Sequence, residues 1–376
     1  MTMSVTTDEA NPDGSVLWYW YDNYHDNGKE STRKTSRDAI KRFERWLATE
    51  GEYKHECHWS DIDLENVSSG KMINPREVTE DEAEAFLHDL QAQFSPDTQQ
   101  TTAAFLSQAY AWCRRETEPV KDDPFGYVLN TLNKNILDSP SGRDAYIIPI
   151  EDARIYIRSW GHPKWTTINL LLAKLSRRAG GISNLDIEDV NLDHPGCDWT
   201  PHPDVRHWDD HILFRADKKA REEGRKSGNK TATTAKYPLD RELRDALIWY
   251  LAIRPDPESP DEPLFLDTFY TRLSAAGISD MIRRKSKTLT EMDDDECQLT
   301  CWYGPHDDDN INPHYWRHWA TTWYQDQLES ESLTDYMRGD TGGGSRAIYD
   351  QYTATKKRKI LKAMPTFLES YAEKKE

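Results

Sequence analysis

The sequence predicts a mainly helical α+β fold, with a small antiparallel β-sheet in the second of two domains. Apolar residues recur at helical spacing through most of the chain, as they do over residues 31–49. Strand-like patterns are confined to a few short segments, of which residues 211–217 are the clearest. A stretch containing Pro, Gly and Ser at residues 139–146 separates the two halves. A length of 376 residues lets each half bury a core of its own.

The composition is acidic, with a formal net charge of −18. A charge of that sign repels phosphate, so any nucleic-acid surface on this chain has to be locally basic. The acidic residues are dispersed rather than gathered in a tail, which favours adaptation to a salt-rich cytoplasm, where the Debye length falls to about 3 Å near 1 M salt. An ordinary acidic cytosolic protein is the alternative.

The five cysteines are scattered and odd in number, which argues against a disulfide framework and for a reducing compartment. The N-terminus lacks a basic and apolar signal, and no run approaches the roughly 20 apolar residues of a membrane helix. We therefore expect a cytoplasmic protein. Two Cys/His clusters lack the paired spacings of a structural zinc site, so we expect no metal there. They are His55, Cys57 and His58, and Cys297, Cys301 and His306.

The first domain, residues 29–140, is predicted to be a small helical bundle. Residues 1–28 are expected to form a partly disordered leader whose aromatic residues, 18–24, pack on this domain. Thr79 and Glu82 form a capping box ahead of one helix. The four expected helices cover residues 31–49, residues 79–94, a segment from residue 97 to the Glu-Thr-Glu-Pro stretch at 116–119, and residues 124–137.

The helix at residues 31–49 carries an unusual concentration of basic side chains for so acidic a chain. Its apolar stripe leaves Arg33, Lys34, Arg37 and Lys41 on the remaining surface. Such a surface favours contact with phosphate groups, and a merely solvated helix face is the alternative.

The second domain, residues 147–376, is predicted to combine helices with a short sheet. One helix runs from Pro163 to about residue 179, where Gly180 and Gly181 are expected to end it and where Arg177 and Arg178 lie. Arginines near a helix C-terminus also complement its dipole, which is the alternative to a functional role. Further helices are expected at residues 150–160, 241–253 and 269–287, and strands near residue 190, at 211–217 and ending at 238–239.

A distinctive segment begins at Asn312, which is a helix-capping residue followed by Pro313. This start places His314, Arg317 and His318 three and four residues apart on one helix face. Farther on, glycines 342–344 break the helical pattern before Tyr349 and Tyr352. The pattern predicts a hydroxyl nucleophile on a movable arm, near an imidazole and a guanidinium.

In order along the chain, Arg178, His314-x-x-Arg317, Gly339-Asp340 and Tyr349 resemble the active-site boxes of the tyrosine recombinase (phage-integrase) family, in a halophilic, archaeal form. The resemblance extends over roughly residues 30–355 and is strongest at residues 312–352. It implies a core-binding domain that clamps DNA and a catalytic domain with a C-terminal tail helix. Spacing back from Pro238 in a β-hairpin makes Lys230 the active-site lysine, with Lys226 as the second choice.

The resemblance implies a reaction that needs no metal or nucleotide cofactor. Arg178 and Arg317 would clamp the phosphate oxygens, Lys230 would protonate the leaving 5′-oxygen, and His314 would accept the proton of Tyr349 or hold the phosphate. The tyrosine becomes joined to a DNA 3′-phosphate. Asp340 would accept a hydrogen bond. The expected DNA-binding residues are Arg33, Lys34, Arg37, Lys41, Lys226 and His318.

Two departures from the family pattern leave an alternative open. Gly181 replaces a glutamate that helps to hold the first arginine, for which Arg177 is the fallback, and Asp340 replaces a histidine or tryptophan. A catalytically impaired DNA-binding protein of the same fold is therefore the second hypothesis, and an acidic interaction protein without a DNA role is the third. The resemblance implies double-stranded DNA as partner and a homo-tetramer on paired sites, assembled from monomers. Residues 356–376 are expected to form an amphipathic helical tail that docks either on a neighbouring protomer or on its own domain.

Overall fold

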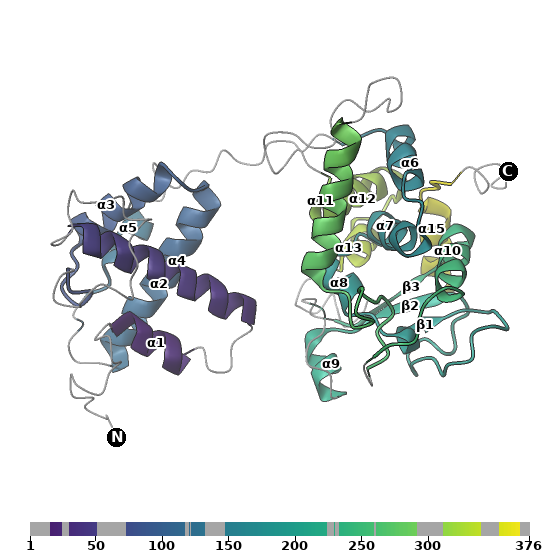
Figure 1. The fold of residues 1–376 in the computed structure, drawn as a ribbon, viewed down its shortest axis with the longest axis horizontal. Helices are drawn as coiled ribbons and strands as arrows, with labels where there is room; N and C mark the ends of the chain where they lie inside the picture. The colour runs from purple at the N-terminus through teal and green to yellow at the C-terminus, as the bar shows by residue number, and fades with distance from the viewer. Residues whose placement is uncertain are drawn as a thin grey trace. The chain divides into compact units, whose positions relative to one another are not determined.

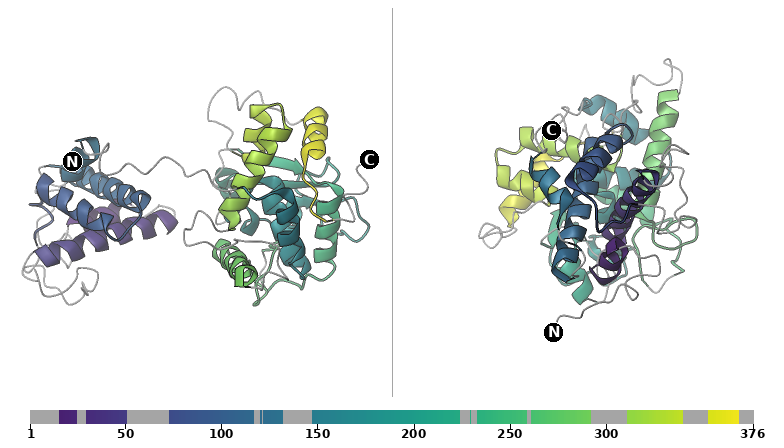
Figure 2. Two further views of the ribbon diagram at one scale, coloured as in Figure 1. Left: turned by 90° about the horizontal axis from the view of Figure 1, so that it is seen from above. Right: turned by 90° about the vertical axis from the view of Figure 1, so that its left-hand side faces the viewer.

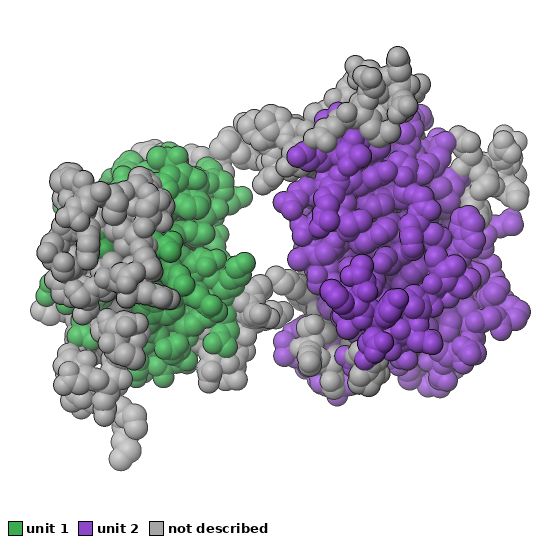
Figure 3. Space-filling view, in the orientation of Figure 1, with its two compact units in different colours: residues 1–143 green, residues 144–376 purple. Residues whose placement is uncertain are grey.

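The computed structural model describes residues 16–24, 30–50, 73–116, 120, 122–131, 147–223, 229, 233–258, 261–291, 311–339 and 353–368. The chain divides into two compact units, residues 1–143 and residues 144–376 (Figures 1 and 3). Each unit has its own hydrophobic core.

The secondary-structure elements in the described part of unit 1 are all helices (Figures 1 and 2). Its centre is a cluster of buried aromatic rings in which Phe43 lies within 5.0 Å of both Phe86 and Phe125, measured between ring centroids. The aromatic stretch near the N-terminus forms a helix of its own, whose Leu17 and Trp20 are buried in the same core. The helices are α1 (Val16–Tyr24), α2 (Glu30–Glu50), α3 (Glu80–Gln91), α4 (Pro96–Glu116) and α5 (Pro124–Thr131).

The capping box predicted ahead of α3 is confirmed. The Thr79 side chain accepts a hydrogen bond from the Glu82 backbone N–H, and the Glu82 carboxylate accepts one from the Thr79 backbone N–H at 2.7 Å. The helix predicted at 124–137 is shorter in its described part, because α5 ends at Thr131 and the remaining residues lie outside the described ranges. The 139–146 stretch also lies outside them.

Unit 2 combines helices with a three-stranded antiparallel sheet in the order β1-β2-β3, which confirms the predicted fold class. Val190 pairs with Ile212, and His211 and Phe214 pair with Pro238 and Ala235. The helices are α6 (Ile150–Arg158), α7 (Pro163–Leu175), α8 (Ala179–Ser183), the 3-10 helix η4 (Ile187–Asp189), α9 (Asp217–Glu222), α10 (Arg241–Leu251), α11 (Ala275–Glu291), α12 (Pro313–Gln327), α13 (Glu331–Arg338) and α15 (Ala354–Ala363). The strands are β1 (Val190–Asn191), β2 (His211–Phe214) and β3 (Ala235–Pro238).

Helix α7 lies at the centre of unit 2 and packs against α10 and α12 (Figure 1). Every residue from Thr167 to Leu175 is buried, including the charged Lys174. The Lys174 ammonium lies 2.5 Å from an Asp240 carboxylate oxygen and also pairs with Glu242. A buried lysine requires such partners, because an unpaired charge inside a protein is costly.

The prediction of one helix over residues 163–179 is wrong. Helix α7 ends at Leu175, because Ser176 adopts a left-handed backbone conformation with φ 53°. Gly180 and Gly181 do not end a helix but lie inside the next one, α8. The chain therefore turns sharply between α7 and α8, and the Arg177–Arg178 pair lies in this turn.

Two other boundary predictions are also wrong. The strand predicted at 211–217 ends at Phe214, and helix α9 follows, so the connection from β2 to β3 is more than a hairpin turn. The helix predicted from residue 269 begins at Ala275. Ahead of it, an Asp267 carboxylate oxygen accepts the backbone N–H groups of Phe269 and Thr271, which stabilises a turn instead.

The C-terminal tail packs on its own unit. Helix α15 ends at Ala363, so the prediction of helix over residues 364–368 is wrong, and residues 369–376 lie outside the described ranges. The backbone N–H of Phe367 donates to Glu242 at 3.0 Å, and the fully buried Phe367 ring lies 5.6 Å from that of Trp319. Of the two expected docking modes, the described contacts are those of a tail on its own domain.

The buried tail predicts a large loss of stability when Phe367 is truncated. Phe367→Ala should lower the free energy of unfolding of unit 2 by about 3–5 kcal/mol, because it leaves a cavity beside Trp319. Denaturant unfolding monitored by tryptophan fluorescence measures the change. Phe269→Ala is the matched control, since that ring is 77% exposed, and its effect should stay within about 0.5 kcal/mol. Equal effects of the two substitutions would show that the tail does not contribute to this core.

Candidate active site

Three segments that are distant in sequence meet at one corner of unit 2, which we call the arginine corner: residues 176–178, Arg317 of α12, and residues 337–339 at the end of α13. Arg317 Nη1 donates to the carbonyl oxygen of Ser176 at 3.0 Å and to that of Arg338 at 2.6 Å. Arg177 Nη2 donates to the carbonyl oxygen of Met337. Two guanidinium groups thus fix the end of α13 against the turn after α7.

The two neighbouring arginines of the turn have opposite environments. Arg177 is only 3% exposed, its guanidinium lies 4.5 Å from the Tyr237 ring centroid and 5.3 Å from that of Phe214, and its Nε donates to the Leu175 carbonyl oxygen. Arg178 is exposed at the N-cap position of α8. Arg177 therefore stabilises the corner, and Arg178 is the arginine of the pair that faces solvent.

The start of α12 agrees with the prediction. The Asn312 side chain accepts the backbone N–H groups of His314 at 2.8 Å and Tyr315 at 2.9 Å, and Pro313 occupies the first turn. His314 and His318 are exposed, and their Nε2 atoms lie 2.9 Å apart. Arg317 is 4% exposed and extends into the arginine corner. The helix therefore presents two imidazoles to solvent beside a buried guanidinium.

Asn229 fills the space next to Gly181 and was not predicted. A Cβ atom on Gly181 would lie 3.4 Å from Asn229 Oδ1 and 3.6 Å from the Phe214 ring. Asn229 Nδ2 and its backbone N–H both donate to the Arg215 carbonyl oxygen. Its Oδ1 is buried and accepts no hydrogen bond from the described residues. A buried hydrogen-bond acceptor, Asn229 Oδ1, therefore lies beside the position where the family resemblance places a glutamate. In the sequence, the absence of that glutamate was the one sign that another residue could supply an acceptor here.

A second unpredicted feature is a buried ion cluster around Arg215, at the end of β2. Burial acts to lower the pKa of this guanidinium, but the surrounding carboxylates, Asp189 foremost, raise it. The cluster anchors the strand that supports Asn229 to η4 and α9. Its pairs are Arg215 with Asp189 at 2.8 Å, with Glu188 at 2.9 Å, with Glu223 at 3.1 Å and with Asp186 at 3.2 Å, and Arg272 with Asp186 at 2.5 Å.

Several predicted site residues lie outside the described ranges: Lys226, Lys230, Asp340, Tyr349 and its neighbour Tyr352. The described chain nevertheless fixes both ends of the segment that bears the tyrosines. Gly339 ends α13 in a left-handed conformation with φ 70°, next to the arginine corner. Thr353 caps α15 by accepting the Lys356 backbone N–H. The two predicted Cys/His clusters also lie outside the described ranges.

The predicted basic face of α2 is partly ordered by α1. The guanidinium groups of Arg33 and Arg37 lie 5.7 and 5.8 Å from the Tyr21 ring centroid, and Arg37 Nε donates to the Tyr21 hydroxyl. Lys34, Arg37 and Lys41 are exposed. Cation–π contact holds two of these cations in place without neutralising their charge.

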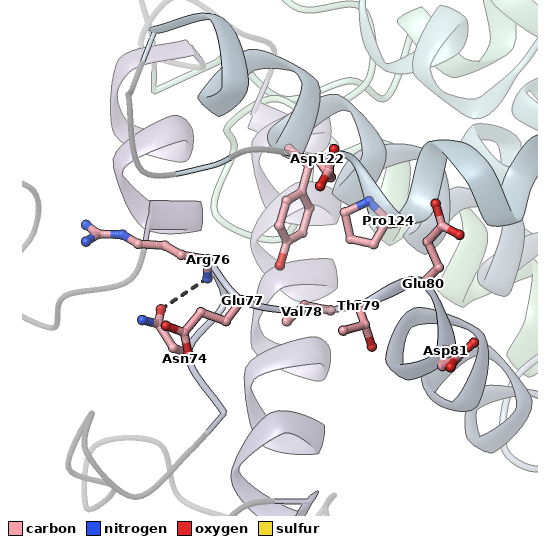
Figure 4. Close-up of a pocket in the computed structure, with 10 residues that line it drawn as sticks. Asn74, Arg76, Glu77, Val78, Thr79, Glu80, Asp81, Asp122 and Pro124 are labelled. Carbon is pink, nitrogen blue, oxygen red and sulfur yellow. Dashed lines mark hydrogen bonds between the residues drawn. The ribbon is translucent and has the colours of Figure 1, made fainter.

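A cavity of about 770 Å³ in unit 1 is unsuited to phosphate (Figure 4). Among the described residues that line it, Arg76 is the one basic residue, and the carboxylates outnumber it. Four acidic side chains would repel an anion. They are Glu77, Glu80, Asp81 and Asp122.

Within the described ranges, no helix is long and apolar enough to cross a membrane. No group of three or more His, Cys, Asp or Glu side chains suited to a metal ion occurs among the same residues.

No protein-family model matches the sequence, and no curated protein matches it significantly. Solved integrase structures do match its fold. The transposon Tn1549 integrase in complex with a circular intermediate DNA aligns with a TM-score of 0.59 at 12% identity, over 92% of this chain and 98% of that one. A lambda integrase dimer bound to a COC′ core site gives 0.56 at 13% identity, over 90% and 98% of the two chains. A lambda integrase tetramer bound to a Holliday junction gives 0.58 at 14% identity, over 90% and 79%. The chain therefore has the fold of these integrases.

The packing around Gly181 predicts how this position tolerates a side chain. Gly181→Ala should raise the free energy of unfolding by up to about 1 kcal/mol, as Gly180→Ala should, because both residues lie in a helix and a Cβ meets at most ordinary contacts. Gly181→Glu should instead lower it by about 1–3 kcal/mol, because the longer side chain has to displace Asn229 and Phe214. Thermal and denaturant unfolding measure both changes. A glutamate tolerated as well as alanine would show that Asn229 does not fill this space.

Proposed function

We propose that this protein is a tyrosine-type site-specific DNA recombinase, an integrase that cuts and rejoins DNA through a covalent 3′-phosphotyrosine. The observation that carries the proposal is the arginine corner on an integrase fold. In it, Arg317 is bonded to the turn that bears Arg178 and to the end of α13, from which the tyrosine segment departs. His314 lies one turn of α12 from Arg317.

The two arginines suit the charge of a phosphodiester. Attack on its phosphorus places negative charge on the non-bridging oxygens, and groups already held in position stabilise that charge at little reorganisation cost. Guanidinium groups stay charged and match phosphate geometry. A guanidinium has five N–H donors, so Arg317 can bond to the carbonyls of the corner and to phosphate together. Exposed Arg178 would approach from the adjoining turn.

The remaining residues would move the protons. The Tyr349 oxygen attacks phosphorus and its proton passes to His314, while the bond from phosphorus to the 5′-oxygen breaks and Lys230 protonates that oxygen. Asp340 accepts a hydrogen bond nearby. The reverse steps with a new 5′-hydroxyl rejoin the DNA, so no metal or nucleotide cofactor is needed. Asn229 Oδ1 is a buried acceptor beside Gly181, where the family resemblance places the glutamate.

DNA binding would divide between the units. Residues 29–140 would clamp the duplex through Arg33, Lys34, Arg37 and Lys41, and residues 147–376 would add Lys226 and His318. Because the chain is acidic overall, these local basic groups would set the register on DNA. We expect the protein to be a monomer in solution and to assemble as a tetramer on paired DNA sites. We expect it to act in the cytoplasm of a salt-adapted cell, on the DNA of a mobile element. The solved lambda integrase tetramer on a Holliday junction supports the assembly.

The proposal that Tyr349 is the nucleophile can be tested by trapping the covalent intermediate. On a nicked suicide substrate that releases a short strand, Tyr349→Phe should abolish the covalent protein–DNA adduct and leave binding intact, because only the attacking hydroxyl is lost. Denaturing gel electrophoresis detects the adduct, and Tyr352→Phe is the matched control. Loss of the adduct in Tyr352→Phe instead would move the nucleophile by one turn, and the absence of an adduct in every protein would overturn the proposal.

The proposed roles of Arg178 and Arg317 predict that their loss lowers the rate of DNA cleavage much more than the affinity for DNA. Arg178→Ala should slow adduct formation by at least about 100-fold, since its guanidinium acts on charge that develops in the transition state. DNA affinity should fall far less. Arg317→Ala should behave alike, and circular dichroism is needed to verify folding because this residue is buried. Arg283→Ala on α11, with a side chain 61% exposed, is the control and should change neither quantity. Equal losses of rate and affinity at Arg178 would mean that it only anchors phosphate.

A further inference from the structure

The His314–His318 pair has a geometry that the recombination chemistry does not require. The two rings project from adjacent turns of α12, their centroids are 4.4 Å apart, and their planes are perpendicular. The Nε2 atoms are 2.9 Å apart, so one ring donates a hydrogen and the other accepts it. Both side chains are exposed, so ions in solution can reach the pair.

Two nitrogens that converge in this way can hold one metal ion. Zinc binds imidazole nitrogen at about 2.05 Å in tetrahedral geometry, which places two such nitrogens about 3.3 Å apart. The observed pair reaches that separation when the rings move apart by a few tenths of an ångström. Positions four residues apart on a helix face one another. The backbone therefore needs no change to form a chelate.

The helix that carries the pair is firmly held, which lowers the entropic cost of binding. Asn312 caps it, Trp316 and Trp319 are buried beneath it, and Arg317 ties it to the arginine corner. The helix backbone therefore holds the two histidines one turn apart.

We propose that His314 and His318 form a two-histidine chelate for a divalent first-row transition ion such as Zn²⁺, Ni²⁺ or Cu²⁺. Imidazole suits these ions, and two protein ligands leave further coordination positions for water or a phosphate oxygen. A bound ion occupies the His314 nitrogen and withdraws it from proton transfer. This inhibitory consequence rests on the proposed function, whereas the chelate itself does not.

Calorimetric titration of the full chain with ZnCl₂ tests the chelate, with Co²⁺ absorption as a second readout. Losing a direct ligand should cost more than the roughly 10- to 100-fold that loss of an outer-shell partner costs, so His318→Gln and His314→Gln should each lose the tight phase. His88→Gln is the matched control, because His88 is exposed on α3 and pairs with Glu84. Zinc bound by other groups of the chain adds the same heat in every variant, so the difference between isotherms reports on the histidine pair. An His318→Gln isotherm that superimposes on the wild-type isotherm overturns the proposal.

Adduct formation with and without saturating Zn²⁺ tests the inhibitory consequence. Each protein is compared with its own metal-free rate, so a change in basal activity does not enter the ratio. Zn²⁺ should slow the wild type by at least about tenfold, a chelator should restore the rate, and His318→Gln should show a ratio near one. A wild-type rate indifferent to Zn²⁺ overturns the inhibitory consequence. No adduct in metal-free wild type overturns the proposed function instead, and the chelate is then decided by calorimetry.

Discussion

Two buried guanidinium groups hold the candidate active site together. The last carbonyl groups of a helix have no partner within it and need donors from elsewhere. At the arginine corner, Arg177 and Arg317 supply those donors to Met337 and Arg338 of α13. Arg317 also bonds to Ser176, in the turn that presents Arg178. The positions of Arg178, His314 and Gly339 all depend on these contacts, because each residue belongs to a segment that they join.

The sequence was informative where structure is decided locally. The capping box of Thr79 and the Asn312–Pro313 start of α12 need only neighbouring residues, and both are present. The fold class followed from such segments together with their spacing. The left-handed turn at Ser176, the burial of Arg177 rather than Arg178, and the Asn229 amide beside Gly181 were not predictable. The first two depend on distant contacts, such as that of Arg177 with Met337, 160 positions away, and that of Ser176 with Arg317, 141 positions away. The third depends on the space that the missing side chain of Gly181 leaves for Asn229.

The acidic composition has uses inside the protein as well as at its surface. Asp189 and Asp186 pair with buried Arg215, and Asp240 and Glu242 with buried Lys174. A buried cation without such partners would be strongly destabilising. Glu242 also accepts the backbone N–H of Phe367, so the same carboxylate stabilises the core lysine and the docked tail. Part of the negative charge therefore neutralises buried cations and stabilises the fold. Only the carboxylates that face solvent would repel DNA bound as proposed.

The docked tail limits how far the tyrosine can travel. Tyr349 precedes Thr353 by four residues (353 − 349 = 4), and Thr353 begins helix α15 on unit 2. A fully extended chain advances at most about 3.6 Å per residue, so the tyrosine stays within about 14 Å of that anchor while α15 remains in place. The proposed nucleophile can therefore act only within that distance of Thr353 while the tail stays docked. A greater reach would require α15 to leave its position on unit 2, where the Ile360 side chain is fully buried.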